Sequence, residues 1–146
     1  VIESHASTAG LFGHGYTYSA HPVGAAAALA TLRLIDELEI VDHVAGVAPY
    51  LHEQMHAQLG QHAHVGDIRG QGLMIGIELV KDRGTKEGFP MADRTGRKVV
   101  KAAAARGLIT RALGDIMVFA PPLVIERGEL DELVDKFVAA VNDVVG

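Results

Sequence analysis

A polar loop runs directly into a helix of small residues near the start of the chain. The loop reads His14-Gly15-Tyr16-Thr17-Tyr18-Ser19-Ala20-His21-Pro22, and an alanine-rich stretch follows it. Because proline has a preset φ and no N–H to lose, Pro22 suits the first helical position, with His21 or Ser19 as the cap. The free N–H groups of such a helix end favour an anion, and the Thr17 hydroxyl can add a hydrogen bond. The pattern predicts a phosphate-binding site, and a capped helix without a ligand is the alternative.

Arg111 is the second residue whose side chain could bind a substrate. We expect it at the end of a short strand, just before a Gly114-Asp115 turn. A guanidinium at such an edge can hold a carboxylate in a bidentate fork. The alternative is a surface arginine paired with an acid such as Asp115, which contributes little energetically. Arg111 is therefore a candidate handle for the carboxylate of a substrate.

Other constellations give no site. His52 and His56 stand four residues apart on a predicted helix and could share a metal, but no third ligand is near in sequence, so we predict no metal. The glycines at 70, 72 and 76 have one residue too many between them for a dinucleotide fingerprint and lie in strand-like sequence. The sequence also lacks a G-x-S-x-G elbow, so it gives no support to a serine hydrolase.

Composition sets the broad class of the protein. The chain has 146 residues, a net charge of −5 and 49% hydrophobic residues, enough for one domain with a real core. Its 13 Lys and Arg residues are scattered, which argues against a nucleic-acid partner. It has no cysteine, no apolar run approaching 18 residues and no signal-peptide pattern. We therefore expect neither disulfides nor a membrane span, and a cytoplasmic location.

The apolar spacing predicts four helices and four strands. Helices are expected over residues 22–38, 41–59, 95–106 and 130–145, and strands over 65–69, 73–80, 108–111 and 116–120. The first helix should pack closely on both sides because it holds many small residues. This order of elements predicts an α+β fold, with helices over one face of a small, mostly antiparallel sheet.

Four local features refine that prediction. Pro49 should either kink the second helix or start a new one. Glycines at 70 and 72 predict a tight bend or bulge between the first two strands. Gly107 is expected as the left-handed cap of the third helix. Glu126 stands where Ser or Thr is the usual cap, which predicts a less well-anchored start to the last helix.

Four segments, in order and with matching spacing, resemble class III (ω-type) pyridoxal-phosphate aminotransferases. They are His14–Pro22, Arg69–Val80, Gly107–Arg111 and Phe119–Ile125. The resemblance covers nearly the whole chain. It implies the small C-terminal domain of a fold-type I pyridoxal-phosphate enzyme over residues 41–146, preceded over residues 1–40 by the end of the large cofactor domain. It also implies small amine and keto-acid substrates.

The resemblance assigns roles to three residues. Thr17 corresponds to the threonine that hydrogen-bonds pyridoxal phosphate in the neighbouring subunit, and Tyr16 would lie beside it, so a homodimer or higher oligomer is implied. Arg111 corresponds to the arginine that binds the keto-acid carboxylate. The motif Ser19-x-His21-Pro22 favours the branch of the family that moves an amino group from an ω-amino acid or amine to pyruvate. Ala20 stands where glycine is usual, which weakens the match at the loop.

No catalytic residue is expected in this chain. In the family the Schiff-base lysine lies upstream of the threonine loop, and the lysines present match no such motif: Lys81, Lys86, Lys98, Lys101 and Lys136. The chain also opens without methionine. We therefore interpret it as a fragment that is inactive alone. A fold relative such as an aminomutase, racemase or decarboxylase, and a non-catalytic truncated dimerisation module, are the alternatives.

Overall fold

The computed structural model describes residues 15–146, which fall into two compact units divided after Leu38. The first unit contains helix α2 (Pro22–Glu37), and the second contains all the strands and three further α-helices. Residues 1–14, which include His14 of the predicted loop, lie outside the described residues. The assignment of residues 1–40 to a large cofactor domain stays a prediction.

Helix α2 begins at the predicted proline but differs from expectation in two respects. His21 is its N-terminal flanking residue with extended backbone, and no side chain caps the helix. The Ser19 hydroxyl instead accepts the Tyr16 backbone N–H at 2.9 Å. His21 thus holds the predicted N-cap position, but neither its side chain nor that of Ser19 donates or accepts a capping hydrogen bond. None of the residues of α2 is buried in this structure. The close packing expected for its small residues is thus absent from the described chain.

The second unit is built on a four-stranded antiparallel sheet, which confirms the predicted α+β class. Its strands are β1 (Val65–Gln71), β2 (Met74–Leu79), β3 (Arg111–Leu113) and β4 (Ile116–Phe119). Their spatial order is β1-β2-β4-β3, so β1 and β3 form the two edges. Every neighbouring pair is antiparallel.

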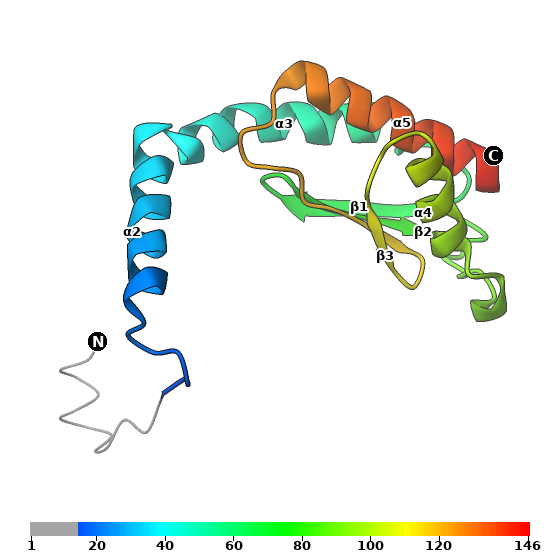
Figure 1. Ribbon diagram of the computed structural model, residues 1–146. Helices are drawn as coiled ribbons and strands as arrows, with labels where there is room; N and C mark the ends of the chain where they lie inside the picture. The colour runs from blue at the N-terminus through cyan, green and yellow to red at the C-terminus, as the bar shows by residue number, and fades with distance from the viewer. Residues whose placement is uncertain (1–14) are drawn as a thin grey trace, which may run out of the picture. The chain divides into compact units, whose positions relative to one another are not determined.

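Three helices cover one face of the sheet: α3 (Ile40–Leu59), α4 (Thr95–Ala105) and α5 (Arg127–Val145) (Figure 1). Alternate strand residues point into the layer between sheet and helices, where Phe119 meets Phe137 edge to face at 4.6 Å between ring centroids. This layer is the hydrophobic core. Its fully buried large side chains are Leu51, Met55, Leu59, Ile75, Ile77, Leu79, Val80, Val99, Met117, Leu130, Val134 and Phe137.

The first hairpin closes in a two-residue turn, in line with the predicted tight bend. Gly72, with φ of +58°, and Leu73 form a two-residue turn between Gln71 and Met74, which suits glycine because its backbone is left-handed there. The irregularity in the ladder lies between Val65 and Asp67, not at the turn. The bend predicted there is therefore confirmed, whereas the bulge belongs to the start of β1.

Strand β3 begins later in the sequence than predicted, because the turn that ends α4 comes first. Gly107 has φ of +78°, and its N–H donates to Ala104 O while Leu108 N–H donates to Ala103 O, both at 3.0 Å. This is a Schellman cap, so the predicted role of Gly107 is confirmed. Because residues 106–110 connect the end of α4 to the sheet, β3 starts at Arg111. The expectation that Arg111 ends a strand is wrong.

Two expectations for the long helices are resolved. Helix α3 runs without interruption through Pro49, so no new helix starts there. Helix α5 has a capping box, in which the Glu126 N–H donates to the Glu129 side chain at 2.9 Å. Its first turn is therefore anchored, and the prediction of a weak start is wrong because a glutamate pair replaces the usual Ser or Thr.

The predicted surface loop between β2 and α4 contains local order. Asp82 and Glu87 form an isolated antiparallel bridge, and Lys81 pairs with the Glu87 carboxylate at 2.9 Å. A 3₁₀ helix, η1 (Met91–Asp93), then leads into α4.

Candidate functional site

The strand register places four residues in one row across the sheet. Arg111 of β3 is opposite Val118 of β4, Val118 is opposite Gly76 of β2, and Gly76 is opposite Arg69 of β1. Directly opposed residues share a face of an antiparallel sheet. Their neighbours in sequence, such as Ile77 and Met117, are fully buried in the core. The row therefore lies on the face that α3, α4 and α5 do not cover.

A second row on the same face lies two residues away from the first on each strand. It joins Leu113, Ile116, Glu78 and Asp67. The Leu113 side chain is 55% exposed, so an apolar group stands beside Arg111 on the same open face. The open face thus carries a guanidinium at each edge of the first row and a carboxylate pair at one end of the second.

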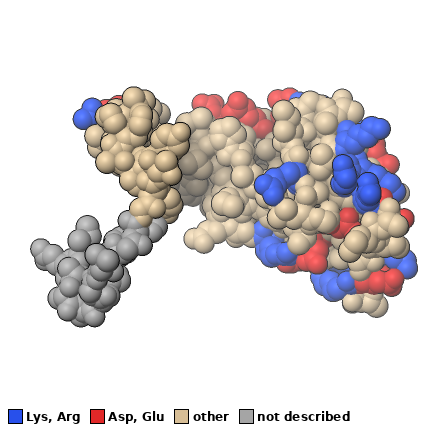
Figure 2. Space-filling model, turned by 60° about the horizontal axis from the view of Figure 1, so that its bottom comes forward, with Lys and Arg blue, Asp and Glu red and all other residues tan. Residues whose placement is uncertain are grey.

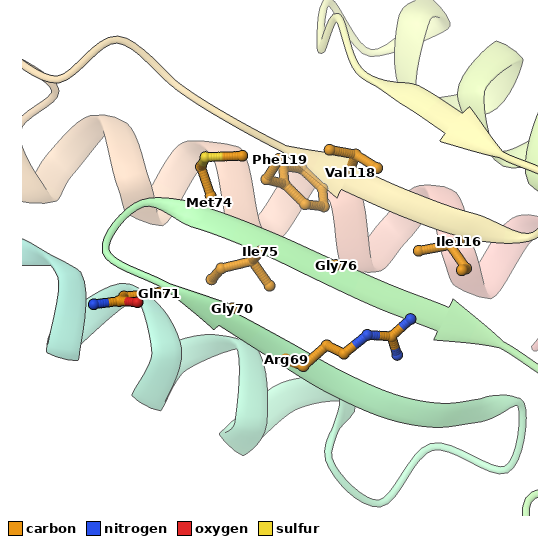
Figure 3. A pocket seen from close by; sticks show the side chains of 9 residues that line it. All are labelled: Arg69, Gly70, Gln71, Met74, Ile75, Gly76, Ile116, Val118 and Phe119. Carbon is orange, nitrogen blue, oxygen red and sulfur yellow. The ribbon is translucent and has the colours of Figure 1, made fainter. Parts of the chain in front are cut away.

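A shallow hollow of about 400 Å³ lies on this face between β1, β2 and β4 (Figure 3). Its lining is mainly apolar and includes Ile116, Val118 and the 65% exposed Met74. Two glycines, Gly70 and Gly76, leave its floor without side chains. Such a surface can receive an apolar group from a ligand or from another part of a protein.

The two arginines of the row differ in their partners. Arg69 Nη1 donates to Asp67 Oδ2 at 2.8 Å and to Glu78 Oε2 at 2.9 Å. Its hydrogen bonds to Asp67 and then Glu78 raise the pKa of Arg69 above its ordinary value. Arg111 is exposed and forms no ion pair or side-chain hydrogen bond with any residue in 15–146. Arg111 is therefore the guanidinium available to a carboxylate from outside.

The alternative partner for Arg111 is occupied elsewhere. Asp115 Oδ1 accepts the backbone N–H of Gly96 at 2.7 Å, at the start of α4. The interpretation of Arg111 as one half of a surface pair with Asp115 is thus contradicted by the geometry.

Tyr16 and Thr17 lie together in the turn that precedes α2, in the other unit. The turn is closed by Ser19 N–H donating to Tyr16 O at 3.0 Å and His21 N–H donating to Tyr18 O at 3.2 Å. Within the described residues, the exposed Thr17 hydroxyl forms no hydrogen bond. The N–H groups at the start of α2 also lack a side-chain cap. The turn therefore presents a hydroxyl and a helix N-terminus, both of which can bind an anion.

Ala20 occupies a left-handed conformation in this turn, with φ of +59°. A Cβ in that region is strained, so glycine would fit this position more easily than alanine does.

The remaining features concern a metal site, the surface charge and membrane-spanning helices. His52 Nε2 bonds to Gly72 O at 3.0 Å, and residues 15–146 hold no group of three or more His, Cys, Asp or Glu that could bind a metal. Lys and Arg side chains are interspersed with Asp and Glu on the second unit (Figure 2). No helix of the described chain is both long and apolar enough to cross a membrane.

Sequence reasoning missed the partners that distinguish the two arginines. Asp67 and Glu78 lie on different strands, and only the register sets them opposite each other. The polar-apolar-polar order of Asp67, Ile68 and Arg69 was the available signal, since it places Asp67 and Arg69 on one face. The contact of Asp115 with α4 had no signal in the spacing.

Comparison with known proteins identifies the relatives of the chain. Residues 2–141 match the family model described as aminotransferase class-III. An uncharacterized aminotransferase, y4uB, of Sinorhizobium fredii is 44% identical over 99% of this chain and 32% of its own length. The putrescine–pyruvate aminotransferase of Pseudomonas aeruginosa is 43% identical over 86% of this chain and 27% of its own length.

Solved structures agree. A thermostable (S)-enantioselective omega-transaminase from Thermomicrobium roseum matches with a TM-score of 0.90 and 39% identity, over 99% of this chain and 32% of that chain. The omega transaminase of Pseudomonas jessenii in complex with PMP matches with a TM-score of 0.85 and 37% identity, over 98% of this chain and 31% of that chain. The chain spans about a third of the length of these relatives. With a family match over nearly all its residues, the chain belongs to the class III aminotransferases, a family of pyridoxal-phosphate-dependent transferases.

Proposed function

We propose that this chain is the C-terminal part of an aminotransferase that moves an amino group from an ω-amino acid or amine to a keto acid such as pyruvate. The chain supplies the carboxylate handle and part of the cofactor seat. The Schiff-base lysine comes from an upstream segment, so the 146 residues alone are inactive. The whole protein acts as a homodimer in the cytoplasm.

The observation that carries this proposal is that Arg111, on the open face of the sheet, forms no ion pair with any residue in 15–146. Arg69, in the same row, is already bound by two carboxylates. A guanidinium without an acid partner binds an incoming carboxylate more readily, because no internal ion pair must be broken first. The adjacent Leu113 side chain offers apolar contact to the carbon atoms beside that carboxylate.

The turn before α2 fits the phosphate of the cofactor. The N-terminus of α2 has no side-chain cap, and the Thr17 hydroxyl forms no hydrogen bond within residues 15–146, so both can provide donors for a phosphate group. Tyr16 precedes Thr17 in the same turn and would lie beside the bound group. When bound, pyridoxal phosphate supplies the electron sink for transamination. In our proposal Thr17 orients its phosphate, in the neighbouring subunit, and takes no part in proton transfer.

The test uses the full-length aminotransferase that contains this chain. Arg111→Ala should raise the KM for pyruvate strongly while amine turnover with a carboxylate-free aldehyde acceptor changes little. Arg69→Ala is the matched control, because it removes a guanidinium from the same row that is already neutralised. Equal losses with both acceptors in Arg111→Ala, or a pyruvate defect of the same size in Arg69→Ala, would refute the assignment.

A second experiment tests the phosphate seat. Thr17→Ala should release pyridoxal phosphate from the full-length enzyme more easily, as measured by cofactor absorbance after dialysis, because one donor to the phosphate is lost. Thr17→Ser keeps the hydroxyl and should retain the cofactor. Retention unchanged in Thr17→Ala would contradict the role of this loop.

A further inference from the structure

The hairpin that carries Arg111 is held by few contacts within the sheet. Strand β3 has only three residues and lies at the edge of the sheet, so it pairs with β4 alone. Strand β4 pairs with β2 on its other side. The position of Arg111 therefore depends on what anchors β3 at its two ends.

Asp115 is the anchor at the turn. It is the second residue of the two-residue Gly114-Asp115 turn that joins β3 to β4. Its carboxylate accepts the Gly96 N–H of α4 at 2.7 Å, and its backbone carbonyl accepts the Leu79 N–H at 2.9 Å. One residue thus ties the hairpin both to a helix and to the end of β2.

The helix needs this acceptor. The residue before α4, Arg94, has a left-handed backbone with φ of +49°, and the N-terminus of α4 has no side-chain cap of its own. Asp115 supplies a carboxylate there from another element, where the helix dipole favours negative charge. The bond therefore stabilises the helix end and the hairpin at once.

Close packing reinforces the bond. Gly96 is buried, and a Cβ at this position would collide with the carbonyl oxygen of Gly114. The same Cβ would come within 3.0 Å of Ala112 Cβ, in β3 itself. Glycine thus allows the start of α4 to approach the strand that bears Arg111.

We propose that Asp115, seated against Gly96, is a positioning residue that sets where the Arg111 guanidinium stands for the substrate carboxylate. This inference rests on the proposed role of Arg111. Asp115 itself touches neither substrate nor cofactor. It acts by holding the turn two residues beyond Leu113, so that β3 cannot shift away from α4.

The experiment compares three variants of the full-length aminotransferase. Asp115→Ala should raise the KM for pyruvate by about ten- to a hundredfold, the size of effect that a displacement of about 1 Å can cause. Its kcat with a carboxylate-free aldehyde should stay close to that of the wild type. Asp115→Asn retains an oxygen acceptor for Gly96 N–H and should restore most of the pyruvate KM.

Glu129→Ala is the matched structural control. It removes the side-chain acceptor at the start of α5, a helix end with no bond to β3. A purely structural role for Asp115 predicts that both alanine variants lose stability and that neither discriminates between the two acceptors. That result would overturn the inference, as would an Asp115→Asn variant as impaired as Asp115→Ala.

The result for Arg111→Ala separates this inference from the proposed function. If Arg111→Ala does not discriminate between pyruvate and the aldehyde, the role of Arg111 fails, and the role of Asp115 fails with it. If Arg111→Ala discriminates and Asp115→Ala does not, only the positioning role fails. Exchange of the Gly96 amide with solvent, faster in Asp115→Ala and protected in Asp115→Asn, verifies that the bond was removed and restored.

Discussion

The two faces of the four-stranded sheet carry side chains of different kinds. On the covered face, Ile68, Ile77 and Met117 form a continuous apolar row beneath the helices. On the open face, the neighbouring row runs from Arg69 to Arg111 and ends in a guanidinium at each edge. A shift of one residue in register would exchange these two rows.

The two faces of the sheet therefore contribute differently, one to stability and the other to binding. The covered face is filled by the chain itself, so its side chains contribute to the free energy of unfolding through burial. The open face is not covered by α3, α4 or α5, so a substitution there changes what the sheet can bind more than whether it folds. The predictions that follow test this separation.

The largest effect is expected on the covered face. Ile77→Ala should lower the free energy of unfolding by about 2–5 kcal/mol, because it leaves a cavity at a fully buried position. Val118→Ala, on the open face of the adjacent strand, should cost less than about 1 kcal/mol. Urea denaturation of both variants measures the contrast, and equal costs would show that the open face is also a core.

Two glycines at the hollow sharpen the comparison. A Cβ at Gly70 would collide with the Met74 carbonyl oxygen, so Gly70→Ala should cost about 1–3 kcal/mol of stability. A Cβ at Gly76 would meet Ile116 Cγ2 at an ordinary 3.6 Å. Gly76→Ala should therefore be neutral or stabilise the chain by about 0.5 kcal/mol. Thermal denaturation ranks the two, and the reverse order would contradict the packing described.

The two arginines of the open row provide a smaller contrast. Arg69→Ala leaves Asp67 and Glu78 directly opposite each other, and their repulsion should lower the melting temperature more at low salt than at high salt. Arg111→Ala should leave the melting temperature unchanged, because Arg111 has no ion pair within the described chain. A salt-dependent loss in Arg111→Ala would show that it has a partner.

The smallest effect is expected outside both faces, in the loop that follows β2. Hydrogen bonds from the backbone and side chain of Thr85 lower the pKa of Asp82 below its ordinary value. The stabilisation is therefore fully present above the ordinary pKa of about 3.9 and is lost as pH falls through the lowered pKa. The Thr85 amide shift in an NMR titration should move with a midpoint below 3.9, and Asp82→Asn should abolish that step.

Local patterns were sufficient for most of the fold. The first two strands were predicted from short apolar runs bracketed by glycine, and Gly107 marked the end of α4, where a left-handed residue was needed. The errors arose where a partner came from elsewhere or from an unusual residue. Glu126 was judged by residue type alone, but the glutamate three residues later completes its capping box.

The candidate site was predicted unevenly. Tyr16, Thr17 and Arg111 were named from the sequence, with their roles implied by the family resemblance. Their roles stay proposals, but the structure supplies the reason that Arg111 rather than Arg69 is available. That distinction depends on the hydrogen bonds of Asp67 and Glu78, which residue type and spacing could not indicate.

The sequence by itself determined the family of this protein, the class of the fold and the residues that we propose to bind a phosphate or a carboxylate. These follow from short-range order: apolar runs, helical spacing, turn residues and contiguous motifs. Only the tertiary structure decided which arginine is neutralised, which face of the sheet stays open and how Asp115 reaches α4. Those outcomes depend on register and on contacts between residues far apart in the chain, where the free energy of each polar group is set by its partner.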